Sequence, residues 1–547
     1  MTHTRQLADL TTAQRQAVEH IDGPLLILAG PGSGKTRVVT HRIAYLLEQG
    51  IAAEQIVALT FTNKAADEMR RRLEQLGSRR GVWLSTFHRF CVRLLRQYAA
   101  QLGLAEHFTI YDTEDSLRAL RHVLKTMGHS TSTYSPRQLA VEISRAKNDL
   151  VEADRYERRS GYGLSTVVAD VYPAYQQLLL TSSAVDFDDL LLHVAVLLRD
   201  HPEIRRSLDE RFKYVLIDEY QDTNFAQYAI LRALCSDYPN LAATGDPDQS
   251  IFGWRGANLN NILQFEQDFP EVRVVRLEQN YRSTKCILRV ADTLISNNVN
   301  RMEKRLYTDN AEGEAVRLAS YATQKEEADT IAATIAFEIG SGKRRALDYA
   351  IFYRINALSR SLELALSEHG IPYQLVKGVE FFQRQEIKNV LAYIHLVSNP
   401  RDDMALLRII NTPPRGIGKK TIERLVDHAA RRSLTLFEAA RQSGLVESLT
   451  KAAATRVARF VTMVDQLCEH AGGSLEPLLG QAITESGYQD HLADSGLEED
   501  QDRLANIEEL LTVAREFDER HPEQGGLEQF LEETALVGDT DDWESQV

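Results

Sequence analysis

Residues 24–36 read PLLILAGPGSGKT, a short apolar run that leads into a glycine-rich turn. The run at Leu25–Leu28 has the length and composition of a buried strand, and a helical pattern follows over residues 36–49. A strand, a glycine-rich turn and a helix in this order are typical of a phosphate-binding loop. The alternative is a turn without a ligand, but such a turn does not require the strand and helix that flank it. The stretch therefore predicts an α/β nucleotide-binding fold.

The predicted phosphate-binding loop has alanine where the strict pattern has its first glycine. Its residues are Ala29, Gly30, Pro31, Gly32, Ser33, Gly34, Lys35 and Thr36. The glycines let backbone N–H groups approach phosphates, and the N-terminus of the following helix adds partial positive charge. We expect the Lys35 ammonium to hold the β and γ phosphates and the Thr36 hydroxyl to bind magnesium. The predicted cofactors are therefore ATP and Mg²⁺.

Further strands extend the parallel sheet expected around this loop. They are predicted at Ile56–Phe61, Tyr214–Ile217 and Leu241–Thr244, and a helical pattern covers Asn63–Leu76. Asp218 directly follows one of these strands, and Asp246 lies just beyond another. Ligands of open parallel sheets bind at the carboxyl ends of the strands. Both acids are therefore expected beside the glycine-rich loop.

The pair Asp218 and Glu219 supplies the groups that a phosphate-binding loop lacks. We expect Asp218 to hold the metal through its hydration shell and Glu219 to orient and deprotonate the attacking water. An Asp-Glu pair by itself is more often a solvated surface, but this pair follows an apolar strand. A kinase or a small-molecule ATPase would use the same two elements. These residues alone therefore predict a P-loop NTPase and leave its purpose open.

Aromatic and polar residues around the predicted nucleotide site indicate its purpose. The candidate DNA contacts are Phe61, Thr62 and Asn63, then Thr86 and His88, and then Phe252, Trp254 and Arg255. Aromatic rings combined with arginine between glycines suit the stacking of unpaired bases without sequence preference. Each group alone has core packing as its alternative. Their common position around the nucleotide site favours contact with a single strand.

Helical patterns interrupt this sheet and follow a second one. Residues 89–202 look helical, and a segment of this length within a sheet predicts an inserted subdomain. A second alternating block begins near Ala315. Its strands are expected at Val316–Ala319, Tyr349–Tyr353 and Tyr373–Val376, with helices over residues 326–339 and 358–369. After Phe382 the pattern is helical and no strand run returns, so the second sheet is expected to lack strands.

Composition limits the class of protein. The chain has 547 residues, 43% hydrophobic and 26% charged, as expected of a globular protein with several domains. Its net charge of −15 argues mildly against nucleic acid, yet arginines cluster at residues 70–72, 79–80 and 89–96, where solvated helix faces are the alternative. No apolar run is long enough to cross a bilayer, and the N-terminus lacks a secretory signal. The four cysteines show no paired spacing. We therefore expect a cytoplasmic protein with no membrane partner.

Taken in order, these motifs resemble those of the UvrD/Rep family of superfamily 1 DNA helicases. The matching segments are residues 10–18, 29–37, 60–66, 85–88, 218–222, 245–256 and 279–283. The resemblance runs through nearly the whole chain. It implies an ATP-dependent helicase that moves 3′ to 5′ on single-stranded DNA and acts at single-strand/duplex junctions. It also implies a place in DNA repair or replication restart, with repair or replication proteins as further partners.

The resemblance implies roles for residues of the nucleotide site. Gln14 would read the adenine, and Tyr281 with Arg37 would sandwich it. Gln249 would sense the γ-phosphate and couple it to the DNA contacts, and Arg282 would reach that phosphate from between two motor domains.

The resemblance also extends the DNA path. Phe61, Phe252 and Trp254 would stack on bases, and the path would continue at Tyr353 and Arg354. Gly416, Gly418 and Lys419 belong to a loop that would approach the backbone of duplex DNA. An ordinary turn between helices is the alternative for this loop.

The implied architecture is a P-loop NTPase with two RecA-like parallel-sheet motor domains, the second incomplete, each with a helical insertion. The first motor would comprise residues 1–88 and 201–284, with its insertion at 89–200. The second would comprise residues 285–381, with its insertion and an acidic tail at 382–547. In the family the chain then returns to finish the second motor, adding an arginine to the ATPase site, whereas this sequence ends at Val547.

We therefore expect weak ATP and DNA binding and poor unwinding from this length of chain. One alternative is a shortened regulator that binds ATP and DNA without unwinding. The second alternative is a nucleotide-dependent enzyme that does not act on nucleic acid. This alternative gives no role to the aromatic residues Phe252 and Trp254.

Overall fold

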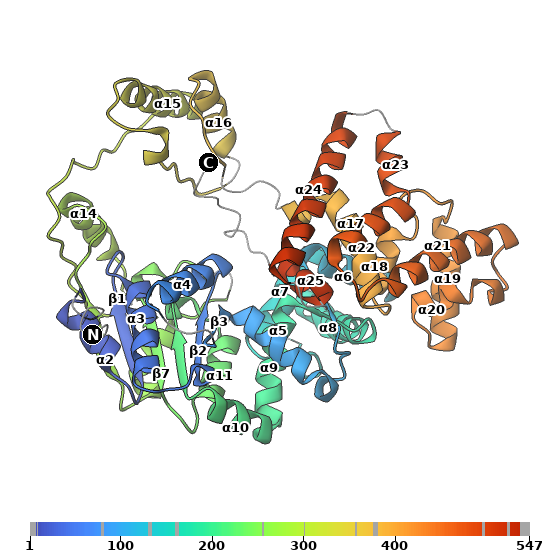
Figure 1. The fold of residues 1–547 in the computed structure, drawn as a ribbon, viewed down its shortest axis with the longest axis horizontal. Coiled ribbons are helices and arrows are strands. Elements are labelled where there is room, and N and C mark those ends of the chain that lie inside the picture. Colours follow the sequence, from blue (N-terminus) through green and yellow to red (C-terminus); the bar gives the residue numbers. More distant parts are fainter. Residues whose placement is uncertain are drawn as a thin grey trace. The chain divides into compact units, whose positions relative to one another are not determined.

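The computed structural model describes residues 7, 9–77, 81–129, 134–158, 163–253, 256–299, 301–355, 358–375, 381–494, 498–521 and 526–536. They form two compact units (Figure 1). Unit 1 contains the described parts of Met1–Arg282, Asn298–Leu306 and Val379–Asp541, and unit 2 contains those of Ser283–Asn297 and Tyr307–Gly378. Residues 298–306 thus belong to unit 1, so the range 285–381 expected for one domain is divided between the units.

Unit 1 is built on a six-stranded sheet. Its strands are β1 (Leu25–Ala29), β2 (Ile56–Thr60), β3 (Trp83–Thr86), β6 (Tyr214–Ile217), β7 (Leu241–Gly245) and β8 (Arg273–Leu277). They lie in the order β3-β2-β6-β7-β1-β8, and every neighbouring pair is parallel (Figure 1). The α/β class and the four strands expected in this sheet are confirmed. The sequence does not indicate the two edge strands: β3 ends in the polar residues Ser85 and Thr86, and Arg273 and Arg276 of β8 are exposed.

The two faces of this sheet bury separate apolar cores. Leu26 and Leu28 of β1 belong to one core, and Leu25 and Ile27 belong to the other, because successive side chains of a strand point to opposite faces. Burial of each such side chain stabilises the fold by about 1.5–3 kcal/mol. Helices α2 (Thr12–Glu19), α3 (Lys35–Glu48) and α4 (Asn63–Gln75) cover one face, and α11 (Phe225–Leu234), α12 (Asn260–Leu263) and α13 (Phe265–Asp268) contribute to the core on the other.

The chain between β3 and β6 is mainly helical, as expected. Its helices are α5 (Phe87–Gln97), α6 (Thr113–Thr126), α7 (Pro136–Asn148), α8 (Gly163–Thr181), α9 (Phe187–Asp200) and α10 (Pro202–Arg211). A small parallel pair, β4 (Thr109–Tyr111) and β5 (Ala184–Asp186), was not predicted, because three residues are too few for a periodic signal. Asp112 and Asp186 follow or end these strands and cap α6 and α9 through their carboxylates.

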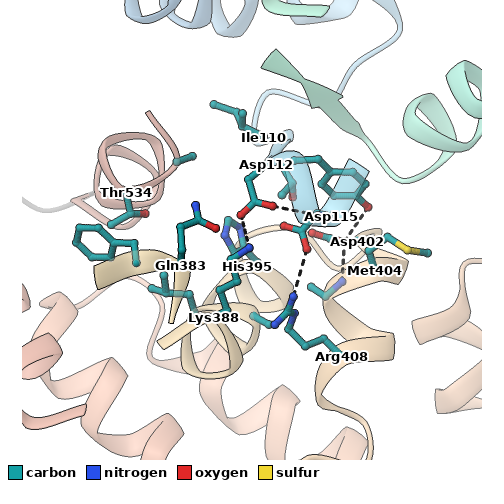
Figure 2. A pocket seen from close by; sticks show the side chains of 17 residues that line it. Ile110, Asp112, Asp115, Gln383, Lys388, His395, Asp402, Met404, Arg408 and Thr534 are labelled. Carbon is teal, nitrogen blue, oxygen red and sulfur yellow. Dashed lines mark hydrogen bonds and ion pairs between the residues drawn. The ribbon is translucent and has the colours of Figure 1, made fainter. Parts of the chain in front are cut away.

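The rest of unit 1 is a helical block that packs on this insertion. Its helices are α17 (Gln385–Ser398), α18 (Asp403–Ile409), α19 (Lys419–Arg432), α20 (Leu436–Arg441), α21 (Lys451–Glu469), α22 (Leu475–Glu485), α23 (Tyr488–Ala493), α24 (Glu498–Arg520) and α25 (Gly526–Ala535). The helical pattern expected after Phe382 is therefore confirmed over the described residues. Tyr111 donates a hydrogen bond to Asp402 at 2.9 Å, and Lys388 pairs with Asp112 at 2.6 Å beside a pocket between the two helical parts (Figure 2).

Unit 2 contains helices α14 (Lys285–Ile295), α15 (Gln324–Gly340) and α16 (Ser359–Glu368). The helices predicted over residues 326–339 and 358–369 are confirmed. The strands predicted at 316–319, 349–353 and 373–376 are wrong: none of their described residues is in a strand, and residue 376 lies outside the described part. An alternating apolar pattern becomes a strand only beside a partner that completes its backbone hydrogen bonds. Leu318 is fully exposed and Phe352 is 93% exposed, as expected of segments without such a partner.

The search for membrane-spanning helices covered the described residues. None of the helices there is both long enough and apolar enough to cross a bilayer.

Candidate nucleotide and DNA-binding site

The glycine-rich loop joins the carboxyl end of β1 to the N-terminus of α3. Gly32 and Gly34 have φ angles of 65° and 90°, in the left-handed region that glycine adopts without strain. A Cβ atom on Gly32 would lie only 2.7 Å from the Cβ of Arg282, so this position also lacks room for a side chain. Because α3 begins at Lys35, its first backbone N–H groups are available beside the loop, as anion binding requires.

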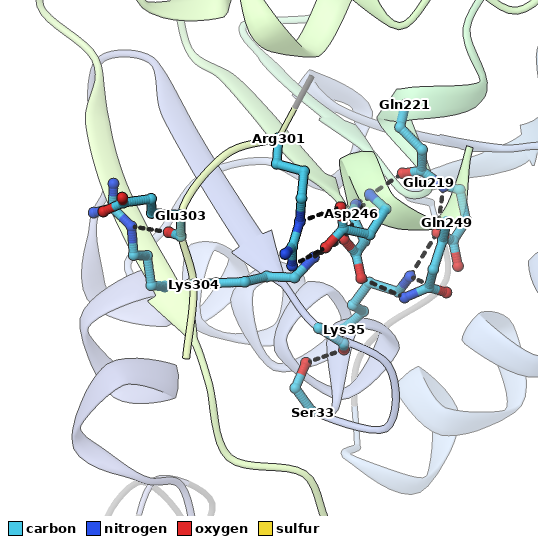
Figure 3. A network of polar contacts seen from close by, with 12 residues as sticks. Ser33, Lys35, Glu219, Gln221, Asp246, Gln249, Arg301, Glu303 and Lys304 are labelled. Atoms are coloured by element: carbon cyan, nitrogen blue, oxygen red, sulfur yellow. Dashed lines mark hydrogen bonds and ion pairs between the residues drawn. The ribbon is translucent and has the colours of Figure 1, made fainter. Parts of the chain in front are cut away.

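Three predicted catalytic side chains meet at this loop (Figure 3). The Lys35 ammonium lies 2.7 Å from a carboxylate oxygen of Glu219 and donates to the side-chain oxygen of Gln249 at 3.3 Å. The three residues follow β1, β6 and β7, whose parallel alignment brings their carboxyl ends to one edge of the sheet. The structure therefore places Lys35 beside two residues that are 184 and 214 positions away from it in sequence.

Asp218 and Glu219 differ sharply in environment. Burial, followed by the nearby Glu219 carboxylate, raises the pKa of Asp218 to about 7. Glu219 is 35% exposed and its backbone has a φ of 54°, which is strained for a residue with a side chain. Strain of this kind is typical of functional positions, and here it places the Glu219 carboxylate against Lys35. Thr36, the other predicted magnesium ligand, is the second residue of α3, directly after the loop.

Polar contacts connect the loop after β6, which carries Glu219 and Gln221, to the loop after β7, which carries Asp246 and Gln249. Gln221 donates to Glu219 at 3.0 Å and accepts a hydrogen bond from the backbone N–H of Asp246 at 3.0 Å. The Asp246 carboxylate accepts from the amide of Gln249 at 2.7 Å. Thus the amide oxygen of Gln249 faces Lys35, while its nitrogen faces Asp246.

Two cations that sequence reasoning missed close this network. Lys304 pairs with Asp246 and lies 2.9 Å from Asp248, and Arg301 donates two hydrogen bonds to the Asp248 carboxylate at 3.1 and 2.9 Å (Figure 3). Burial raises the pKa of Asp248, but hydrogen bonds from Arg301 and Lys304 outweigh it and lower the pKa below its usual value. No local signal marks these cations, because they lie 53 or more positions from their partners in a stretch expected to belong to the second motor.

The residues expected around adenine lie at the same loop. Gln14 is buried and donates to the carbonyl of Ser33 at 3.0 Å, and a Cβ on Gly34 would lie 3.8 Å from the Cβ of Arg37. The segment after β8 folds onto the loop as well: the Tyr281 backbone N–H donates to the carbonyl of Gly32 at 3.0 Å. Tyr281 is 49% exposed, so its ring is accessible.

The predicted DNA contacts follow the carboxyl ends of β2, β3 and β7. Phe61 is half-buried, with its ring 5.7 Å from that of Phe87. Thr62 and Thr86 cap α4 and α5 through their hydroxyls. His88 lies on α5 with its ring against Phe187, Asn63 donates to the carbonyl of Leu536 at 2.9 Å, and Phe252 is half-buried. These residues therefore share the sheet edge that holds the nucleotide residues.

Other predicted DNA contacts lie elsewhere. Trp254 and Arg255 are outside the described residues. Arg354 is exposed in unit 2. Gly416 has a φ of 70°, Gly418 is the N-cap of α19, and Lys419 is the first, exposed residue of that helix in the helical block of unit 1.

Comparison with known proteins agrees with this geometry. Residues 10–270 match the family described as the UvrD/REP helicase N-terminal domain, and residues 275–547 match the UvrD-like helicase C-terminal domain. The chain is 41% identical over 541 residues to the ATP-dependent DNA helicase PcrA of Bacillus subtilis (strain 168), an alignment that covers 98% of this chain and 73% of the relative. It is 41% identical over 546 residues to the PcrA of Leuconostoc citreum, with 98% and 73% covered, and 39% identical over 546 residues to that of Staphylococcus aureus (strain Mu50), with 99% and 74% covered. The chain therefore belongs to the UvrD/Rep family of ATP-dependent DNA helicases.

Proposed function

We propose that this protein couples ATP hydrolysis to 3′ to 5′ movement along single-stranded DNA and acts at single-strand/duplex junctions. The observation that carries the proposal is the convergence of Lys35, Glu219 and Gln249 at one edge of the sheet. That edge also carries Phe61 and Phe252, which suit the stacking of bases. A nucleotide and a single strand would therefore bind at adjacent positions, as a motor requires.

The donor set suits a magnesium nucleotide. Mg²⁺ prefers oxygen ligands and is usually held by one or two carboxylates together with substrate phosphates. Thr36 would supply a hydroxyl oxygen and Asp218 a carboxylate, and a cation beside the buried Asp218 would favour its charged form. When bound, the metal would neutralise charge that develops on the phosphates.

The side chains divide the chemical work. Lys35 would hold the β and γ phosphates, and Glu219 would take a proton from the attacking water and orient it. Gln249 would report the γ-phosphate, because its amide lies between Lys35 and Asp246. Arg282 would stabilise the γ-phosphate, and Gln14, Arg37 and Tyr281 would bind the adenine.

Three further statements remain proposals that rest on the family resemblance. They are the domain ranges stated from sequence, a role in DNA repair or replication restart, and contact with duplex DNA by Gly416, Gly418 and Lys419. A cytoplasmic location is also a proposal. It is supported by the four cysteines, all of which are free thiols.

We further propose that unwinding by this length of chain is weak. In support, the described residues of unit 2 contain no strand, so they do not form the second sheet that a two-motor mechanism needs. A strand-displacement assay tests this proposal beside an ATPase assay with and without single-stranded DNA. DNA-stimulated hydrolysis with slow displacement is the expected result. Robust unwinding would refute the proposal of weak unwinding. Binding of ATP and DNA without ATP hydrolysis would favour the alternative of a shortened regulator that binds both without unwinding.

A further inference from the structure

We propose that Lys304 is a positioning residue for ATP hydrolysis, holding Asp246 so that Gln249 faces the nucleotide. The inference rests on the proposed function of Gln249 as the sensor of the γ-phosphate. Lys304 lies on residues 301–306, a segment here called the strap, which packs in unit 1 (Figure 3).

The strap is attached to unit 1 by both backbone and side-chain contacts. Arg276 donates to the carbonyl of Glu303 at 3.2 Å, and the backbone N–H of Arg305 donates to Glu278 at 2.7 Å. These bonds align the strap beside β8. Lys304 and Arg301 then reach from it to the loop that carries Asp246, Asp248 and Gln249.

The ion pair between Lys304 and Asp246 is buried, so its loss should disturb the neighbouring contacts of Asp246. The side chain of Asp246 is fully buried and that of Lys304 is 3% exposed, so water cannot replace either partner. A buried carboxylate without a cation takes up a proton or moves toward solvent. Either change would disturb the 2.7 Å hydrogen bond that Asp246 accepts from Gln249. The amide of Gln249 could then rotate away from the orientation in which its oxygen faces Lys35.

The position of the strap adds a second consequence. Residues 283–297 before it and 307–378 after it belong to unit 2, so the chain enters and leaves unit 2 on either side of the strap. Lys304 and Arg301 thereby join these connections to the Gln249 loop through charged contacts. The Gln249 loop is thus held by cations from the segment of unit 1 that lies between these two connections.

The test compares Lys304→Gln with Arg305→Gln in the full chain. Arg305 is the neighbouring cation of the strap and is exposed, and its substitution keeps the backbone bond to Glu278. We expect Lys304→Gln to lower kcat of DNA-stimulated ATP hydrolysis on the order of 10- to 100-fold while KM for ATP changes much less, because positioning rather than binding is lost. Lys304→Arg should restore most of kcat, whereas Arg305→Gln should behave as the unchanged chain.

A second readout does not depend on turnover. The affinities for ADP and for ADP with aluminium fluoride, which mimics the transferred phosphate, are measured by titration for the same variants. Lys304→Gln should weaken binding of the fluoride complex but not of ADP alone. Equal behaviour of Lys304→Gln and Arg305→Gln in both assays would overturn the inference.

A second variant distinguishes a folding defect from a loss of positioning. If Lys304→Gln does not fold, Arg301→Gln replaces it: Asp248 then loses the Arg301 cation, Lys304 is drawn toward Asp248 and away from Asp246, and a smaller fall in kcat is expected; no fall in that variant overturns the inference. If the unchanged chain itself does not hydrolyse ATP, the proposed function fails, and the titrations alone decide the inference.

Discussion

The Nζ atom of Lys35 lies 2.7 Å from Oε2 of Glu219, although 184 positions separate the two residues in sequence. Their strands, β1 and β6, are not neighbours, since β7 lies between them. The pair forms because parallel strands end at the same edge of the sheet and the strained backbone at Glu219 turns its side chain toward the loop. The ATPase chemistry should therefore depend on both residues.

Replacement of Glu219 by glutamine should leave ATP binding nearly intact but slow hydrolysis about 10²- to 10⁴-fold, the usual contribution of a general base. The amide keeps the shape of the side chain but cannot accept a proton. Steady-state hydrolysis with saturating single-stranded DNA, together with nucleotide titration, measures the two effects. The exposed Glu271 provides a control, and Glu271→Gln should hydrolyse ATP normally. Normal turnover in Glu219→Gln would remove Glu219 from the proposed mechanism.

Phe252→Ala should weaken binding of single-stranded DNA by about 1–3 kcal/mol, the value of one base stacked on an aromatic ring. ATP hydrolysis without DNA should change little, because the contacts of Lys35 with Glu219 and Gln249 do not use the side chain of Phe252. Fluorescence anisotropy with a labelled oligonucleotide of mixed sequence measures the affinity. The adjacent Ile251 is 71% exposed and not aromatic, so Ile251→Ala serves as the matched control. Equal affinities of the two variants would contradict stacking by Phe252.

Tyr111→Phe should lower the free energy of unfolding of the helical parts of unit 1 by about 1.5–3 kcal/mol, the range for a hydrogen bond to a charged group. The hydroxyl of Tyr111 is buried and donates to Asp402 at 2.9 Å, so its loss leaves a buried carboxylate oxygen of Asp402 with one hydrogen-bond donor fewer. Urea unfolding monitored by fluorescence measures the change. Tyr98→Phe removes an exposed hydroxyl, which accepts a bond from Gln97, and should cost far less. A similar loss of unfolding free energy in both variants would show that burial of the hydroxyl does not determine the size of the loss.

Asp403→Asn should remove part of the pH dependence of stability. Burial raises the pKa of Asp403 to about 7, against about 3.9 in an unfolded chain. A carboxyl whose pKa is raised by folding stabilises the fold fully below pH 3.9, and that stabilisation is lost as the pH rises through 7. In the unchanged chain the Asp403 carboxylate accepts a hydrogen bond from the backbone N–H of Leu436 at 3.0 Å, and the side-chain oxygen of asparagine can accept the same bond.

The advantage of Asp403→Asn over the unchanged chain in melting temperature should therefore be larger at pH 8 than at pH 5. Thermal unfolding at both pH values measures it. Asp427→Asn, which removes an exposed carboxylate of α19, is the control variant. Parallel pH profiles for the unchanged chain and Asp403→Asn would contradict the raised pKa.

Local patterns predicted the part of the fold that local interactions specify. The apolar runs at β1, β2, β6 and β7 are buried on both faces of the sheet, so their composition alone indicated strands. β3 and β8 are the two edge strands and give no continuous apolar run, because β3 ends in Ser85 and Thr86 and β8 carries two exposed arginines. In unit 2 the same reasoning was wrong, since the described residues of its apolar segments have no strand beside them.

By itself the sequence determined the strand, glycine-rich turn and helix at residues 24–36, and it placed an acid pair directly after another strand. These features depend on neighbours within a few positions, where spacing alone sets the backbone. Only the tertiary structure decided that Lys304, 58 positions beyond Asp246, would neutralise it and hold Gln249 toward Lys35. Contacts between distant segments arise from the packing of the sheet, and the burial that makes an ion pair at Asp246 necessary exists only after that packing has formed.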